Sequence, residues 1–114
     1  MTAVVRVFFH SGVTTAPVAA GTRYTTDSVA MLKQPYIARS AVTAVPGEAQ
    51  STSAAPSSTK IVFVQVQEGK AVHYEINPEN RSTPADTSSP ILSGDTQFEC
   101  GLNWTLSFRE VETA

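Results

Sequence analysis

The amino-acid sequence predicts an all-β protein: a single small β-sandwich, jelly-roll-like or partly open barrel, with long coil segments. Several short runs alternate apolar and polar residues, which is the period of a half-buried strand. Pro, Gly, Asn and Asp separate these runs at close spacing, as in small sandwiches and barrels. A length of 114 residues fits one domain over residues 1–114.

The first strand is expected near the N-terminus. Val5, Val7 and Phe9 recur at every second position, and Val4 and Phe8 add apolar surface on the opposite face. This strand is therefore expected to bury both faces in part.

Other segments of the first half carry weaker signals. Residues 37–45 predict a second strand with small side chains, whereas residues 14–22 and 46–59 predict coil. A 14-residue coil inside a domain is unusually long, so 46–59 is either mobile or ordered by a partner. Residues 1–59 can accordingly join the sandwich or form an extended arm.

Helix signals are scarce. Asp27 can cap a segment that runs to Lys33 and that Pro35 stops, which predicts a helix of two turns at most. Residues 83–86 can form a single capped turn.

The strongest local pattern lies between residues 60 and 77. A β-branched alternating run from Ile61 is followed by the turn Glu68-Gly69-Lys70 and a second alternating run. This predicts a β-hairpin that forms the core of the sandwich within residues 60–112. Across the hairpin, one side is expected to carry Val62, Val64 and Val66, and the other Val72, Tyr74 and Ile76. Ile61 and Phe63 point to the opposite face, so the open end is expected to be covered on both sides.

The last strand places Trp104, Leu106 and Phe108 on one face and polar residues on the other. Two shorter strands are expected before it, one at residues 91–92 and one around Phe98.

Composition excludes several classes of partner. Charged residues make up 16% of the chain, the net charge is −2, and the cations are scattered, so neither nucleic acid nor a membrane surface is an expected partner. A single cysteine excludes an intrachain disulfide. Arg6 and His10 interrupt the N-terminal apolar run, so we expect no signal peptide.

No pattern of residues indicates chemistry. His10 and His73 are expected to face outward from strands, without the further ligands that a metal site requires. Cys100 is expected to be a semi-buried inert thiol and Trp104 a core residue. We therefore expect no catalytic residue, metal or cofactor, and no enzymatic activity.

The C-terminal half shows a resemblance. Its order is the Val62-Phe-Val-Gln-Val arm, His73-Tyr74-Glu75, Ser82-Thr83-Pro84-Ala85, the turn Ile91-Leu92-Ser93-Gly94-Asp95, and the strand from Trp104. This pattern resembles small virion proteins of tailed bacteriophages, of the capsid decoration (cement) type, over roughly residues 60–112.

The resemblance implies a structural protein on the outer surface of a phage capsid, assembled in the host cytoplasm. It implies the major capsid protein and further copies of the chain, as a homotrimer, as partners. Such a protein stabilises the shell because it binds only the assembled form. The N-terminal region and the 46–59 coil would then order on the capsid, and the expected interface residues are Val4, Phe8, Pro46, Pro56, Ile61 and Phe63.

Two alternatives stay open. One is another virion component, of the neck, tail or a head fibre. The other is a carbohydrate-binding or adhesion module, which would display Tyr24, Tyr36 and Tyr74 on a flat face or in a cleft.

Overall fold

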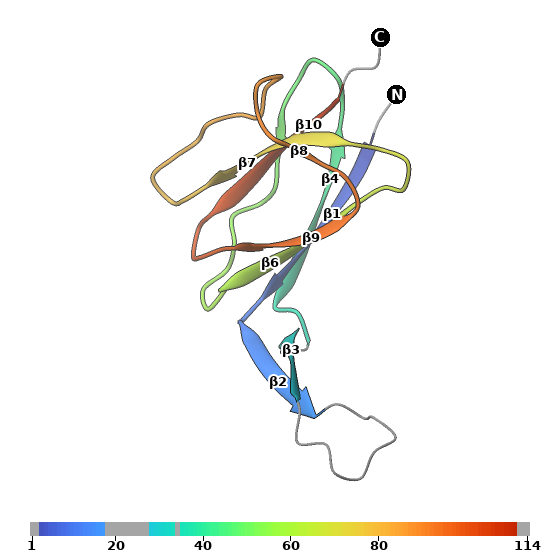
Figure 1. Ribbon diagram of the computed structural model, residues 1–114. Coiled ribbons are helices and arrows are strands. Elements are labelled where there is room, and N and C mark those ends of the chain that lie inside the picture. The colour runs from blue at the N-terminus through green and yellow to red at the C-terminus, as the bar shows by residue number, and fades with distance from the viewer. Residues whose placement is uncertain (1–2, 18–27, 34, 112–114) are drawn as a thin grey trace.

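Two four-stranded antiparallel sheets pack face to face, and a two-stranded ribbon extends from one end of them (Figure 1). The computed structural model describes residues 3–17, 28–33 and 35–111. Within these ranges there is no helix, and the predicted all-β sandwich is confirmed. In chain order the strands are β1 (Ala3–His10), β2 (Val13–Pro17), β3 (Ser28–Leu32), β4 (Ala38–Ala44), β5 (Gln50–Ser51), β6 (Ile61–Val66), β7 (Val72–Asn77), β8 (Ile91–Leu92), β9 (Asp95–Glu99) and β10 (Thr105–Glu110).

The first sheet has the strand order β4-β1-β6-β9, and the second has the order β5-β10-β7-β8. Successive side chains of a strand point to opposite faces of its sheet, so every second residue faces the other sheet. In the longer strands most of these inward residues are apolar, and they fill the space between the sheets. The expected strands at 37–45, at 91–92, around Phe98 and at the C-terminal end are confirmed as β4, β8, β9 and β10.

The core fills the space between the sheets. Val7, Phe9 and Val64 from the first sheet and Leu106 and Phe108 from the second are at most 1% exposed. A fully buried side chain of this size contributes about 1.5–3 kcal/mol relative to an exposed one. The core therefore joins strands from both ends of the chain.

The expected β-hairpin at residues 60–77 is wrong. β6 pairs with β1 and β9, whereas β7 pairs with β10 and β8, so the turn between them crosses from one sheet to the other. In that turn the amide of Lys70 donates to the carbonyl of Gln67 at 3.0 Å, and Gly69 adopts a φ of 79°. Both arms do turn their apolar faces toward each other, but across the core. A hairpin and a sheet-to-sheet connection share this alternation, and pairing with β1 and β10 decides between them.

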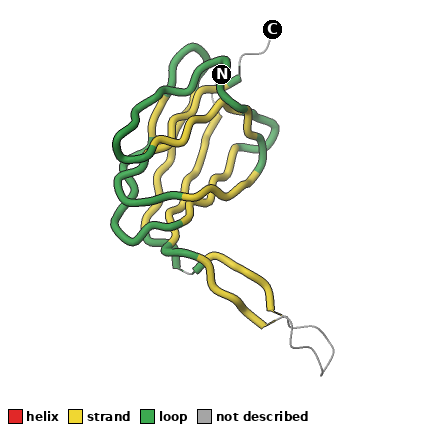
Figure 2. Tube along the Cα trace, turned by 60° about the vertical axis from the view of Figure 1, so that its left-hand side comes forward, coloured by secondary structure: helices red, strands yellow, loops and turns green. Residues whose placement is uncertain are grey.

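The ribbon consists of β2 and β3, which pair antiparallel beyond the ends of β1 and β4 (Figure 2). Two expectations are wrong here: residues 28–32 form a strand instead of the helix expected over 27–33, and residues 14–17, expected as coil, belong to the strand β2. A helix of two turns gains little without tertiary contacts, whereas each strand of the ribbon supplies hydrogen-bond partners for the other. The remaining residues of the expected coil, 18–22, lie outside the described part of the chain.

A bulge joins the ribbon to the first sheet. Phe9 lies opposite Ala38 and Val13 lies opposite Leu32, so three residues on one strand (10–12) face five on the other (33–37). Extra residues on one strand bend the pair and redirect its side chains. Residues 33 and 35–37 are thereby displaced outward at the edge of the sandwich.

The segment 46–59 is ordered by the chain's own contacts with β10. The amide of Thr52 donates to the carbonyl of Leu106 at 2.9 Å, and the Leu106 amide returns a bond to Thr52 Oγ1 at 3.1 Å. The Ala55 amide donates to the Trp104 carbonyl at 2.8 Å, and Ala55 is 2% exposed. The segment is therefore not a mobile coil in this fold, and it needs no external partner to become ordered. It extends the second sheet at the edge next to β10.

The stretch 83–86 forms no helical turn. The chain turns instead at 86–89, where the Ser89 amide donates to the Asp86 carbonyl at 3.0 Å.

Residues from both halves of the chain build the first sheet. β1 lies inside this sheet, between β4 and β6, and all of its inward residues from Ala3 to Phe9 are buried. Residues 3–10 and 38–51 thus belong to the sandwich, and residues 13–17 and 28–32 form the ribbon.

Candidate functional site

An apolar surface lies on the outer face of the first sheet, at the end next to the ribbon. It contains Phe8 on β1, Phe63 on β6 and Tyr36 from the bulge, which we call the aromatic patch. The ring centroid of Phe8 lies 5.1 Å from that of Tyr36 and 6.4 Å from that of Phe63. These separations are typical of favourable aromatic pairs. Tyr36 is 38% exposed and its neighbour Ile37 is 41% exposed, so the patch is open to a partner.

The bulge is held in place by His10. The Nδ1 atom of His10 lies 2.9 Å from the carbonyl oxygen of Lys33, and since a carbonyl only accepts, Nδ1 carries the proton. The His10 ring also meets the Tyr36 ring edge-on at 6.4 Å. One side chain therefore fixes the backbone of the bulge and supports the aromatic patch.

Two arginines border the aromatic patch. Arg6 and Arg39 are exposed on the same outer face, and together with Phe8, Ser40 and Ala41 they line a recess of about 300 Å³. Ala41 lies opposite Arg6, and its short side chain leaves the recess open at that position. The surface thus combines aromatic residues with arginine, and both residue types are enriched in protein interfaces.

Three of the six expected interface residues come together at the aromatic patch. Phe8 and Phe63 are directly opposite each other, and Ile61 lies opposite His10 on the same face. Val4 is on the same face but at the far end of β1. The remaining two residues lie elsewhere: Pro46 in the turn after β4 and Pro56 in the loop before β6.

Sequence reasoning missed the contribution of the bulge. The sequence indicates Tyr36 only for a carbohydrate surface, and it does not indicate Ile37, Arg6 or Arg39 as site residues. The available signal was the pair of apolar residues directly after Pro35, a position that suits an exposed turn. Their location over Phe8 depends on the unequal pairing of residues 10–12 with 33–37.

Both histidines lie on the outer faces of their strands, as expected, but neither is exposed to solvent. His10 is 3% exposed and His73 is 6% exposed. His73 Nδ1 lies 3.0 Å from the carbonyl oxygen of Ser89, so each ring donates to a backbone carbonyl of a segment that folds over its strand. Burial and a satisfied hydrogen bond make both residues structural.

Cys100 and Trp104 lie at the same corner of the sandwich. Cys100 is 6% exposed, and burial raises the pKa of its thiol. A raised pKa leaves the thiol protonated and weakly nucleophilic, as expected for an inert cysteine. Trp104 is half-buried against the core, and a Cβ atom at Gly101 would lie 3.0 Å from its indole nitrogen. The close approach explains why glycine occupies that position.

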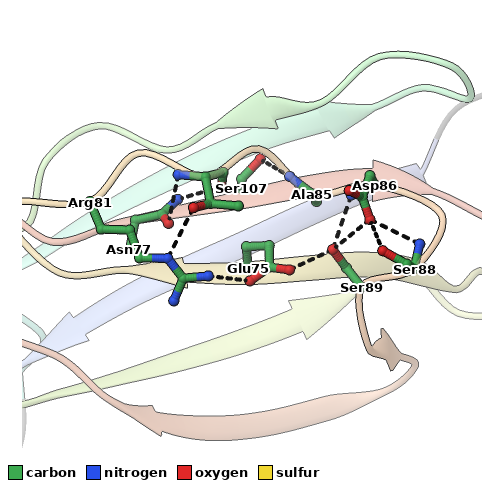
Figure 3. A network of polar contacts seen from close by, with 9 residues as sticks. Glu75, Asn77, Arg81, Ala85, Asp86, Ser88, Ser89 and Ser107 are labelled. Atoms are coloured by element: carbon green, nitrogen blue, oxygen red, sulfur yellow. Dashed lines mark hydrogen bonds and ion pairs between the residues drawn. The ribbon is translucent and has the colours of Figure 1, made fainter.

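A polar network fastens residues 78–90 over the outer face of the second sheet (Figure 3). The Ala85 amide donates to Ser107 Oγ at 3.0 Å, and the Asn77 side chain exchanges two hydrogen bonds with the backbone of Thr83 at 2.9 and 3.1 Å. Asn77 and Ser107 are at most 2% exposed. Because buried polar groups require partners, this face of the sheet needs the covering segment.

Carboxylates anchor both ends of the network. Glu75 accepts from Arg81 at 2.9 Å and from Ser89 Oγ at 2.6 Å. Asp86 accepts from the hydroxyl of Ser88 at 2.6 Å and from its amide at 2.9 Å, and these bonds lower the pKa of Asp86. Every polar group named here is engaged within the fold, so the network reads as structural.

A second recess lies at the end of the sandwich opposite the ribbon. It measures about 680 Å³ and is lined in part by Lys70 and Glu110. Lys70 Nζ lies 3.7 Å from Glu110 Oε1, and within the described ranges Glu110 Oε2 has no hydrogen-bond partner. The Lys70 ammonium group offsets the charge of this carboxylate.

The three tyrosines expected for an adhesion surface are not brought together by the described residues. Tyr36 belongs to the aromatic patch, while Tyr74 faces inward, with its ring centroid 5.0 Å from that of Phe98. Tyr24 lies outside the described part of the chain.

Among residues 3–17, 28–33 and 35–111, no group of three His, Cys, Asp or Glu side chains is placed to hold a metal ion. The same ranges contain no helix long and apolar enough to cross a membrane. Comparisons of the chain with protein-family models, with curated proteins and with solved structures return no match.

Proposed function

We propose that this chain is a structural virion protein that decorates a phage capsid and stabilises the assembled shell. The observation that carries the proposal is the aromatic patch beside the projecting ribbon. Single exposed apolar residues are common on soluble proteins, but a contiguous aromatic group marks an interaction surface. In this role the partners are the major capsid protein and further copies of the chain.

The geometry suits attachment to a broad surface. The outer face of the first sheet is a single strand-built plane, and the ribbon continues from its edge, so both can contact one partner at the same time (Figure 2). The capsid would cover Phe8, Tyr36 and Phe63, while Arg6 and Arg39 would meet acidic or carbonyl groups at the rim. Binding to the assembled shell alone then shifts the equilibrium toward that shell.

The test compares binding to capsids with and without the patch. Purified chain is mixed with capsids of the phage that encodes it, and co-sedimentation is measured for the wild type and for Tyr36→Ala. We expect the wild type to sediment with capsids and Tyr36→Ala to bind at least about tenfold more weakly, because aromatic residues are the usual anchors of interfaces.

The matched control is Ile91→Ala. Ile91 is 59% exposed, but it lies on β8 of the second sheet, away from the aromatic patch. It is expected to bind like the wild type. Wild-type chain that stays in the supernatant would contradict the proposal, and equal loss of binding in both variants would contradict the role of the patch.

A further inference from the structure

The two lateral edges of the first sheet differ in charge. β4 forms one edge, and its single charged residue is Arg39; β9 forms the other edge and carries Asp95 and Glu99. All three side chains are exposed. Within the described residues, β4 pairs only with β1, and β9 pairs only with β6. Each edge therefore leaves a row of backbone donors and acceptors without strand partners.

The edges of the second sheet are protected by their length. β5 and β8 contain two residues each, whereas β4 contains seven and β9 contains five. Very short edge strands give little backbone for another strand to pair with. In the sandwich the first sheet is therefore the one that can be extended.

We infer that copies of this chain associate head to tail, with β4 of one copy pairing with β9 of the next. The first sheet has four strands that alternate in direction, so β4 and β9 run antiparallel to each other. A second copy placed beside the first in the same orientation continues the antiparallel ladder. The inference deepens the proposed self-association by naming its surface.

The charges favour this β4–β9 pairing over β4–β4 and β9–β9 pairing. On the outer face, Arg39 lies in the row that passes through Phe8 and Phe63 to Gln97. If that row continues into the next copy, Arg39 lies beside Gln97 and diagonal to Asp95 and Glu99, within reach of a long side chain.

The pairings of like edges lack this attraction. Two β9 edges would bring their acidic residues together, which is destabilising when the charges lie opposite each other. Two β4 edges would place Arg39 opposite a neutral residue or a second Arg39. Only the β4–β9 contact brings opposite charges within diagonal reach of each other. It uses a different edge on each copy, as in the heterologous interfaces that form rings when the rotation between copies closes.

The experiment measures mass in solution by light scattering, over a series of concentrations and without capsids. The wild type is expected to give a multiple of 12.1 kDa. Arg39→Glu is expected to shift toward 12.1 kDa. The double variant Asp95→Lys/Glu99→Lys is expected to shift in the same way. Because no capsid is present, this result is independent of the test with Tyr36→Ala.

A charge swap within one chain makes the test specific. The triple variant Arg39→Glu/Asp95→Lys/Glu99→Lys reverses both edges and is expected to regain the wild-type mass. Lys60→Glu and Glu68→Lys are the controls, because both residues are exposed and lie outside β4 and β9. They are expected to leave the mass unchanged.

Three results would overturn the inference. The first is wild-type chain of 12.1 kDa at every concentration. The second is a wild-type oligomer that persists in Arg39→Glu or in Asp95→Lys/Glu99→Lys. An oligomer that is lost in Arg39→Glu but kept in Asp95→Lys/Glu99→Lys would indicate β4–β4 pairing. The third is a triple variant that stays small although its circular dichroism and melting temperature match the wild type.

Discussion

At the scale of single residues, several buried polar side chains hold neighbouring loop segments in place through hydrogen bonds. His10 and His73 each donate to a backbone carbonyl, and Asn77 exchanges two bonds with the backbone of Thr83. Each of these side chains is buried and lies on the outer face of a strand. They are buried because residues 33, 35–37 and 78–90 fold over the sheets, and their hydrogen bonds fix those segments in place.

Asp86 yields a prediction about pH. Hydrogen bonds from Ser88 lower the pKa of Asp86 in the folded state. Its contribution is therefore present above the unfolded pKa and lost as the pH falls through the lowered folded value. We expect an NMR titration of Asp86 to show a pKa below the ordinary value of about 3.9. The protection factor of the Ser88 amide, which is its intrinsic exchange rate divided by its measured rate, should fall in the same pH range, because protonation of Asp86 weakens the bond that this amide donates.

The control for this titration is Ser88→Ala. It removes the hydroxyl that lies 2.6 Å from Asp86 Oδ1 and keeps the amide, so the pKa should move part of the way back. An Asp86 pKa at or above the ordinary value in the wild type would contradict the hydrogen-bond geometry.

At the scale of elements, the bulge is the feature that links the ribbon, the first sheet and the aromatic patch. It places Tyr36 over Phe8, and it is tied to β1 by the His10 side chain and by the Ile37 amide, which donates to the Phe9 carbonyl at 2.7 Å. The aromatic patch thus depends on the bulge, where residues 10–12 of one strand face the longer segment 33–37 of the other.

The bulge can be tested with His10→Ala. The substitution removes a hydrogen bond from the Lys33 carbonyl and a ring contact with Tyr36, so the free energy of unfolding should fall by about 1–3 kcal/mol. Denaturant unfolding measures this loss, and hydrogen exchange of the Ile37 amide should increase.

His73→Ala is the matched control for the bulge. It removes an equivalent bond in the second sheet, so it should also destabilise the fold. The exchange of the Ile37 amide should nevertheless follow only the global loss. Local exchange at Ile37 that is the same in both variants would refute the role of His10.

At the scale of the whole molecule, the first and second halves of the chain depend on each other. β1 separates β4 from β6 in the first sheet, and β5 extends the second sheet next to β10. A fragment of residues 60–114 would lose β1 and β4 and expose the inner faces of Val62 and Val64. We expect this fragment not to fold by itself.

The measurement is the dispersion of the amide resonances and the cooperativity of thermal unfolding, with the full chain as the reference. The fragment should show neither, and addition of a peptide of residues 1–59 should restore dispersion. A cooperatively folded fragment would instead show that residues 60–112 hold an independent core.

The sequence by itself determined where β1, β4 and β6 to β10 lie, and which faces of the longer strands among them are buried. The alternating positions of β1, β6 and β10 are visible in the order of residues, because burial of one sheet face imposes a period of two. It also indicated Phe8, Ile61 and Phe63 as apolar residues on the outer face, which a strand that is buried on one face only does not require. Those three lie together on one face of the first sheet.

Only the tertiary structure decided which strands pair and which segments cover them. A hairpin and two strands on facing sheets have the same alternation, so the pairing of β6 with β1 cannot be read from either strand alone. The ribbon strands β2 and β3 lack a clear pattern, because mutual backbone hydrogen bonds form them whatever their side chains. The aromatic patch, the buried histidines and the anchored segment 46–59 follow from contacts between residues far apart in the chain, and such contacts leave no local period.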